Sequence, residues 1–192
     1  MLTDSFLDKQ ADQIPVEILC EVLGKVCVPL AGDRVQELRE ELIHDDQLHA
    51  TMVEVELCVS LIFKPLRHNM KTVINKDPSV FLALWVPILN VIKGILENDS
   101  IENDPSSKSP SNQKMTNDTR ELTVEHLRNV IMVLSSFGVL KGATEEYTDG
   151  SISAHTWTLI EEIGYCKNFV DEWKSAAAKP PSDRSAEREE EE

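Results

Sequence analysis

The sequence predicts an all-α protein built from antiparallel helix pairs. Apolar residues recur every three or four positions in successive segments, which is the spacing of one helix face. Glycine accounts for only 7 of 192 residues, and this scarcity disfavours the many turns of an all-β architecture. Aromatic residues make up 5% of the chain, so the core has to rest on Leu, Val and Ile.

The first predicted helix runs from about residue 15 to residue 30. Pro15 suits its first turn, where a backbone N–H would have no partner within the helix. We expect this helix to end at Gly32-Asp33, with Asp33 capping a short charged helix from Arg34 to Ile43. Its apolar positions form one wide stripe: Ile18, Leu19, Val22, Leu23, Val26, Cys27 and Leu30.

A second, longer helix is predicted to begin near Asp45-Asp46. The same apolar face continues through three or four turns. Pro65 is predicted to kink or end the helix, because proline removes a backbone donor. The apolar face consists of Leu48, Met52, Val55, Val59, Ile62, Phe63 and Leu66.

The third predicted helix starts at Asp77-Pro78, an N-cap residue followed by proline at the first helical position. Apolar residues cover much of its circumference, which indicates a central position in the fold. The stretch from residue 80 to 96 is shorter than the roughly 20 residues of a membrane span. It also carries Asn90 and Lys93, so we expect a buried helix, with a kink at Pro87.

Composition divides the rest of the chain. Residues 98–119 are rich in Ser, Asn, Asp, Lys and Pro and are predicted to form a flexible loop. Helical periodicity resumes afterwards and includes a last helix that carries Trp157 and Trp173. The predicted organisation is a flexible lead (1–13), a helical repeat region (14–97), the loop (98–119), a second helical repeat region (120–175) and a disordered acidic tail (176–192).

Amphipathic helices joined in series suggest antiparallel pairs, and we expect a HEAT-like α-solenoid segment. The sequence contains no residue-level repeat, so this expectation rests on topology. A compact helical bundle is the alternative.

The charge balance bears on partners and compartment. A net charge of -15 repels nucleic-acid phosphates and gives no broad attraction to anionic lipid. We therefore expect protein partners, no nucleic acid, and peripheral membrane association only through those partners. The chain starts without a secretory signal, which predicts a cytoplasmic protein with four reduced cysteines.

Few residues suggest chemistry. The cysteines show no C-x-x-C spacing and are expected to be buried structural thiols. The dense cluster of His44, Asp45, Asp46 and His49 makes a metal contact conceivable, but its aspartates equally suit the start of a helix. No nucleotide-binding loop, nucleophile elbow or H-E-x-x-H motif occurs, so we expect no cofactor and no catalytic residue.

Three tryptophans lie on apolar helix faces and are expected in the core: Trp85, Trp157 and Trp173. Trp157 and Trp173 are in addition candidate partner contacts, because a large aromatic residue near the end of a terminal helix can anchor a neighbouring protein.

Three stretches together resemble the region downstream of the catalytic domain in the large Golgi ARF guanine-nucleotide exchange factors, the brefeldin A-resistance class. Order and spacing agree over about residues 14–174, while Pro87 and the long loop depart from the family pattern. The three stretches are Ile14 to Leu19 with Leu23 to Val26, then Phe81 to Leu89, and then His126 to Asn129 with Val133-Leu134 and Thr156-Trp157.

The resemblance implies a C-terminal HEAT-like regulatory region beside the domain that loads GTP onto ARF. The family's Phe-Arg-x-Pro-Gly-Glu exchange loop does not occur here, so no catalytic residue carries over. We expect a non-catalytic regulatory or scaffold segment in Golgi vesicle trafficking, peripheral to the Golgi membrane. Its partners would be neighbouring helical repeats or an ARF-family GTPase regulatory complex. The alternatives are a stand-alone HEAT-type adaptor and a helical enzyme built around His44, Asp46 and His49.

Overall fold

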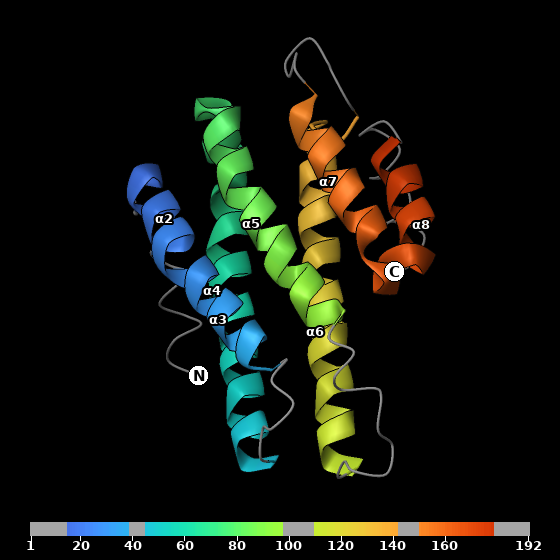
Figure 1. The fold of residues 1–192 in the computed structure, drawn as a ribbon. Coiled ribbons are helices and arrows are strands. Elements are labelled where there is room, and N and C mark those ends of the chain that lie inside the picture. Colours follow the sequence, from blue (N-terminus) through green and yellow to red (C-terminus); the bar gives the residue numbers. More distant parts are fainter. Residues whose placement is uncertain (1–14, 39–44, 98–109, 142–149, 179–192) are drawn as a thin grey trace, which may run out of the picture.

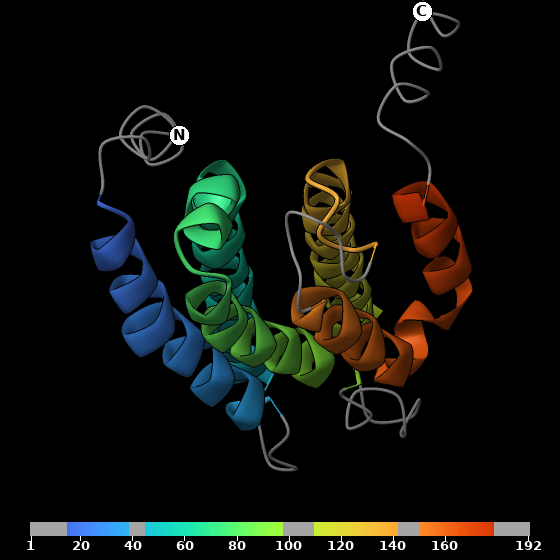
Figure 2. The ribbon, with the colours of Figure 1, turned by 90° about the horizontal axis from the view of Figure 1, so that it is seen from above.

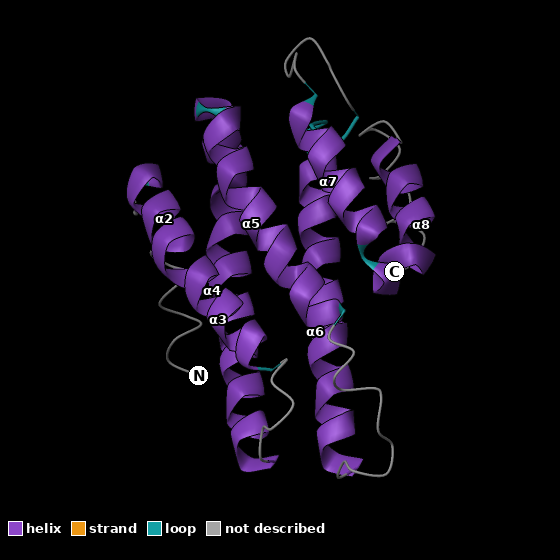
Figure 3. Ribbon diagram, in the orientation of Figure 1, coloured by secondary structure: helices purple, strands orange, loops and turns teal. Residues whose placement is uncertain are grey.

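The computed structural model describes residues 15–38, 45–97, 110–141 and 150–178. Within these ranges the regular elements are all helical (Figure 3), which confirms the all-α prediction. In chain order they are α2 (Val16–Val22), the π-helical turn η2 (Leu23–Cys27), α3 (Val28–Glu37), α4 (Asp45–Lys76), α5 (Pro78–Leu96), α6 (Pro110–Ser136), α7 (Ser151–Glu162), the short 3-10 helix η4 (Gly164–Cys166) and α8 (Lys167–Ala178).

The helices form three stacked pairs (Figures 1 and 2). The first pair is the continuous rod α2–η2–α3 with α4, the second is α5 with α6, and the third is α7 with α8. Between pairs, the rod packs on α5 and α5 on α7, while α4 packs on α6 and α6 on α8. The described parts of the first and third pairs make at most marginal contact, which favours a solenoid-like stack over the compact bundle.

Helix α5 lies at the centre of the stack. By length and composition it is apolar enough to cross a membrane, and 50% of its apolar window is buried inside the structure. A core helix passes the same test, and α5 packs against the rod, α4, α6 and α7. Its start agrees with the prediction, because the Asp77 carboxylate accepts from Ser79 N at 2.9 Å and Pro78 is the first helical residue. The helix continues through Pro87 without interruption.

The first rod does not end at Gly32, so the predicted break at Gly32-Asp33 was wrong. The irregularity lies earlier, in the π-helical turn that directly precedes Pro29. A proline ring clashes with the carbonyl four residues before it, and a wider turn relieves that clash. The buried row accordingly takes a five-residue step, from Leu23 to Val28, and then continues at Ala31 and Val35.

Helix α4 passes through Pro65 and ends only at Lys76, so of the two predicted outcomes, a kink or an end at Pro65, the end is excluded. Ile62 and Leu66 on either side of the proline are fully buried, and this packing offsets the missing backbone hydrogen bond. One turn later, the Asn69 side-chain amide donates to the Pro65 carbonyl at 3.0 Å.

Helix α6 begins at Pro110, so the predicted loop 98–119 is too long by its last ten positions. The first turns of α6 are polar in sequence and show no apolar period that would indicate a helix. Further along, Thr119 Oγ1 donates to Glu56 Oε1 at 2.6 Å and joins α6 to α4. The predicted flexible lead (1–13), residues 39–44 and 98–109, and residues 179–192 of the predicted tail lie outside the described residues.

The predicted last helix is two helices, α7 and α8, joined by η4. Ile163 leaves the helical conformation with a ψ of 103°, and Gly164 follows it. Ile163 and Cys166 are fully buried, so the corner itself packs into the core. Apolar spacing continues through the corner, and this is why the periodicity indicated a single helix. Helix α8 ends at Ala178, three residues beyond the predicted repeat region.

Candidate interaction surfaces

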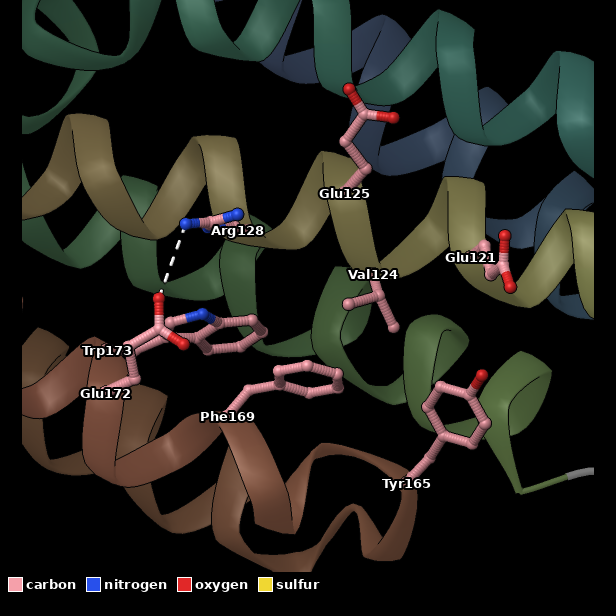
Figure 4. Close-up of a pocket in the computed structure, with 8 residues that line it drawn as sticks. All are labelled: Glu121, Val124, Glu125, Arg128, Tyr165, Phe169, Glu172 and Trp173. Atoms are coloured by element: carbon pink, nitrogen blue, oxygen red, sulfur yellow. Dashed lines mark hydrogen bonds and ion pairs between the residues drawn. The ribbon is translucent and has the colours of Figure 1, made fainter. Parts of the chain in front are cut away.

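A groove runs between α6 and α8, and the predicted site residue Trp173 forms part of it (Figure 4). Its volume is about 250 Å³. Typical small-molecule sites occupy roughly 300–1,000 Å³, so this groove suits one or two side chains of a protein partner better than a cofactor. We call it the α6–α8 groove; its lining residues are Glu121, Val124, Glu125, Arg128, Tyr165, Phe169, Glu172 and Trp173.

Helical periodicity places these side chains together. On α6, Glu121, Val124 and Arg128 are spaced by three and four residues, and on α8 Phe169 and Trp173 are four residues apart, so each set lies on one helix face. Figure 4 shows the Glu125 side chain pointing away from the aromatic rings. Tyr165 comes from η4, the corner that turns the chain from α7 into α8. The groove therefore depends on the packing of the third pair against α6.

Trp173 forms part of the groove wall and is only 1% exposed. Its ring stacks on Phe169 with centroids 5.8 Å apart and planes 15° from parallel. The indole nitrogen is buried and has no hydrogen-bond acceptor within the described chain. Figure 4 shows this nitrogen on the ring edge that faces α6. A buried N–H without an acceptor costs free energy, and such groups are rare in folded proteins.

The groove rim is acidic. Glu121, Glu125 and Glu172 contribute three carboxylates, against the single guanidinium of Arg128. Arg128 lies 3.3 Å from Glu172, and both side chains are more than half exposed, so this ion pair contributes little stability (Figure 4). A further cation, Arg120, is buried and lies 5.8 Å from the Tyr165 ring. The net rim charge is negative, in keeping with the charge of the whole chain.

Trp157, the other predicted contact residue, lies on α7 and lines a second hollow with Leu140, Lys174 and Ala177. It is half-buried, and its indole N–H donates to the Leu140 carbonyl at 3.3 Å. The Lys174 ammonium lies 5.7 Å from the centre of its ring and also pairs with Glu161. Trp173 lies in the core, as expected, whereas Trp157 is only partly buried and packs against the core. Their role as partner contacts stays a prediction.

A second surface lies on the first rod. The wide apolar stripe predicted for this helix divides, because Leu19 and Leu23 are buried while four other residues face solvent. We call these four the rod stripe; they are Ile18 at 53% exposure, Val22 at 45%, Val26 at 56% and Leu30 at 45%.

The π-helical turn η2 keeps the rod stripe on one side of the helix. Residues four apart drift by about 40° around a regular α-helix, because each turn takes about 3.6 residues. The wider turn in the middle of the row reduces that drift. A contiguous exposed apolar row on a folded protein typically marks a contact surface.

His126 is a half-buried titratable group on α6. Its ring stacks on Phe63 of α4, with centroids 5.5 Å apart. Burial lowers the pKa of His126, the Glu125 carboxylate raises it, and the cations of Lys64 and Arg67 lower it further. The imidazole is therefore held towards its neutral form inside the α4–α6 interface.

The predicted metal cluster lies almost entirely outside the described side chains, since of its four members only the His49 side chain is described. No group of three metal-binding side chains occurs elsewhere in the described ranges. All four cysteines are free thiols. Cys58 and Cys166 are buried as predicted, but Cys20 and Cys27 are only half-buried, so the prediction was wrong for these two. Burial raises the pKa of Cys166 to about 11, so its thiol stays protonated at neutral pH.

One family model matches residues 1–164, and its description is "GBF1-like, tetratrico peptide repeat region". Comparison with the curated proteins and with the solved structures found no match. The family match confirms the resemblance to the large ARF exchange factors. It describes the helical repeat as tetratricopeptide, whereas HEAT-like pairs were the expectation from the sequence. Both are stacks of antiparallel helix pairs. The chain belongs to the GBF1-like tetratricopeptide repeat family.

Proposed function

We propose that this chain is a non-catalytic regulatory or scaffold segment of an ARF guanine-nucleotide exchange factor that acts in Golgi vesicle trafficking. Family membership and the stack of helix pairs support this proposal. The chain would act in the cytoplasm and reach the Golgi membrane through its protein partners. Exchange chemistry would belong to a separate domain of the parent protein.

The rod stripe is the observation that carries the scaffold role. In a stack of helix pairs, each pair covers the apolar face of its neighbour. The rod packs on α4 and α5 with one face, yet it exposes four aliphatic side chains on another. A neighbouring helical repeat would cover these side chains and gain their burial free energy, at roughly 25 cal/mol for each Å² of apolar surface.

Light scattering on the purified chain at rising concentration tests the scaffold role. An uncovered rod stripe should make the isolated chain self-associate. Replacing Val22, Val26 and Leu30 with Gln should shift the chain towards monomer. The matched control replaces three exposed apolar residues outside the rod stripe, Val53, Leu57 and Val80, with Gln. This variant should behave like the wild type. A wild-type chain that stays a monodisperse monomer would contradict the proposal.

A nucleotide-exchange assay tests the non-catalytic part of the proposal separately. The purified chain should not accelerate nucleotide release from an ARF-family GTPase. Acceleration by this chain alone would place catalysis within it and overturn the assignment.

The second candidate function is a stand-alone adaptor of the helical-repeat type, and the α6–α8 groove favours it. The groove offers a binding surface that does not depend on a neighbouring repeat. If the isolated chain is a stable monomer with its rod stripe exposed to solvent, the adaptor function would be favoured over the scaffold function.

A further inference from the structure

The rod stripe lies at one end of the stack, on the helix that forms the outer edge of the first pair (Figures 1 and 2). Its four aliphatic side chains follow one another at intervals of four residues, from Ile18 to Leu30. Such a row specifies an apolar partner but not the direction in which that partner lies. The charged residues beside the row supply the direction.

One flank of the rod stripe carries two exposed and opposite charges. Glu21 and Lys25 directly precede Val22 and Val26, so both lie one helical step to the same side of the row. Their side chains are 67% and 74% exposed, and they form an ion pair of 2.8 Å within the rod. A pair this exposed contributes little stability, and both head groups can still contact a partner.

The two charges are placed almost symmetrically about the middle of the rod stripe. The stripe extends from residue 18 to residue 30 and is centred at residue 24, whereas Glu21 and Lys25 are centred at residue 23. The two centres differ by about 1.5 Å along the helix. A two-fold axis at this point would therefore place Glu21 of one rod opposite Lys25 of another, and the reverse contact would form on the other side of the axis.

The remaining charges on this flank also favour an antiparallel partner. In that arrangement Glu17 would lie opposite Pro29, and Asp33 would lie opposite Pro15, so neither would meet a like charge. A parallel arrangement would place Glu17, Glu21 and Asp33 each opposite the same residue of the other copy. Like charges at close range repel, so the order of charges selects the antiparallel direction.

We infer that the repeat covering the rod stripe is the rod of a second copy of this chain, packed antiparallel about a two-fold axis near residue 24. This inference rests on the proposed function, which makes the rod stripe a contact surface. An isologous contact of this kind buries the same four aliphatic side chains on each copy and forms two identical Glu21–Lys25 contacts. The contact is small, and a charge of -15 on each copy opposes it, so association should be reversible and depend on concentration.

Charge reversal in the full 192-residue chain tests the pairing. E21K makes both positions of the pair basic, and K25E makes both acidic, so each variant alone would place like charges opposite one another at two contacts. The dissociation constant should rise roughly tenfold, because two contacts of up to about 1 kcal/mol each are lost or reversed. The double variant E21K/K25E should associate like the wild type. Sedimentation equilibrium at several concentrations measures all four chains.

Mixing the two single variants gives a second readout. A basic E21K copy would face an acidic K25E copy, so the mixture should form a mixed dimer at a concentration at which each variant alone is a monomer. Labelling one variant with nitrogen-15 lets native mass spectrometry distinguish the mixed dimer from the two self-pairs. A mixture that stays monomeric would overturn the inference.

Matched variants outside the rod separate this contact from net charge. E121K on α6 and K167E on α8 make the same changes of charge at exposed positions. Each should associate like the wild type. If they weaken association as much as E21K and K25E do, the effect comes from net charge and the inference is wrong.

The same measurements distinguish failure of this inference from failure of the proposed function. A wild-type chain that never associates would contradict both. Association that is lost when Val22, Val26 and Leu30 are replaced with Gln, yet is unchanged in E21K and K25E, would leave the rod stripe as a contact surface. That result would overturn the antiparallel second copy as its occupant.

Discussion

Trp85 and Trp173 are both almost fully buried, at 0% and 1% exposure, but their surroundings differ. Trp85 lies where the second pair meets the third, and its N–H donates to Thr156 Oγ1 at 2.8 Å. Trp173 lies between α6 and α8, and its N–H has no acceptor within the described residues. Both rings stack on a phenylalanine four residues earlier in the chain, Phe81 and Phe169 respectively.

The two tryptophans differ in whether the buried indole N–H has a hydrogen-bond acceptor. At Trp85 every polar atom of the ring is satisfied, so the contact between α5 and α7 gains from both packing and hydrogen bonding. At Trp173 the packing is comparable but one donor remains unpaired beside a groove. The buried indole donor is thus satisfied where the second pair meets the third, and the one between α6 and α8 is not.

Truncating the central tryptophan should have the largest effect. Trp85→Ala removes a fully buried side chain and leaves the Thr156 hydroxyl without its donor, so we expect a loss of about 3–5 kcal/mol or more in the free energy of unfolding. Trp173→Ala loses similar packing but no hydrogen bond and should cost less. Urea unfolding followed by circular dichroism measures both. A larger loss for Trp173→Ala would reverse the comparison.

Phenylalanine substitutions isolate the hydrogen bond from the packing. Trp85→Phe should cost about 1–3 kcal/mol more than Trp173→Phe, because only the first breaks a buried hydrogen bond. Adding Thr156→Val to Trp85→Phe should recover part of that difference, since it removes the unsatisfied hydroxyl. The same unfolding experiment applies. Equal costs for the two phenylalanine variants would mean that the Trp85 bond contributes nothing.

The N-cap residue Asp77 is expected to stabilise the start of the central helix α5. Ser79 hydrogen bonds hold the pKa of Asp77 below its usual value, so the charged cap stabilises the fold above the unfolded pKa of roughly 4. This stabilisation is lost as pH falls through the folded pKa. Asp77→Ala should lower the thermal midpoint at pH 7, and Asp77→Asn should lower it less, because an amide oxygen still accepts. An unchanged midpoint in Asp77→Ala would show that the cap is dispensable.

The smallest expected effect concerns the helix that forms one wall of the groove. The pKa of His126 is lower in the folded chain than in the unfolded chain. Between the folded-state pKa and the unfolded pKa of about 6.5, the unfolded chain therefore binds more protons at this site than the folded chain does. Stability should therefore be complete above about pH 6.5 and decline as pH falls towards the folded pKa. His126→Phe keeps the stack on Phe63 and should reduce this decline. Comparing urea midpoints at neutral and mildly acidic pH measures it, and an identical decline in the variant would exclude His126 as its source.

Periodicity and capping residues were enough to predict the helical class, the start of α4 and the start of α5. They left open whether α4 ends at Pro65 or passes through it, because the outcome depends on the tertiary packing of Ile62 and Leu66. The early start of α6 was missed because its first turns carry no apolar face. Apolar periodicity indicates which face of a helix is buried, and it cannot locate the start of a helix whose first turns are polar.

Only one part of the groove, Trp173, was predicted from the sequence. Trp173 was a candidate contact because it lies near the end of a terminal helix, yet its rim carboxylates looked like an ordinary solvent face of α6. Bringing α8 and its aromatic residues against α6 requires the corner at Gly164, which the periodicity did not reveal. The unpaired indole N–H depends on side-chain orientation and has no signal in the sequence at all.

The size of the endogenous polypeptide tests the central claim most directly. An antibody raised against residues 120–175 should detect a protein several times larger than the 192-residue chain, because the account assigns this chain to a larger exchange factor. Detection of a single band at the size of 192 residues would contradict the account and identify a stand-alone helical-repeat protein.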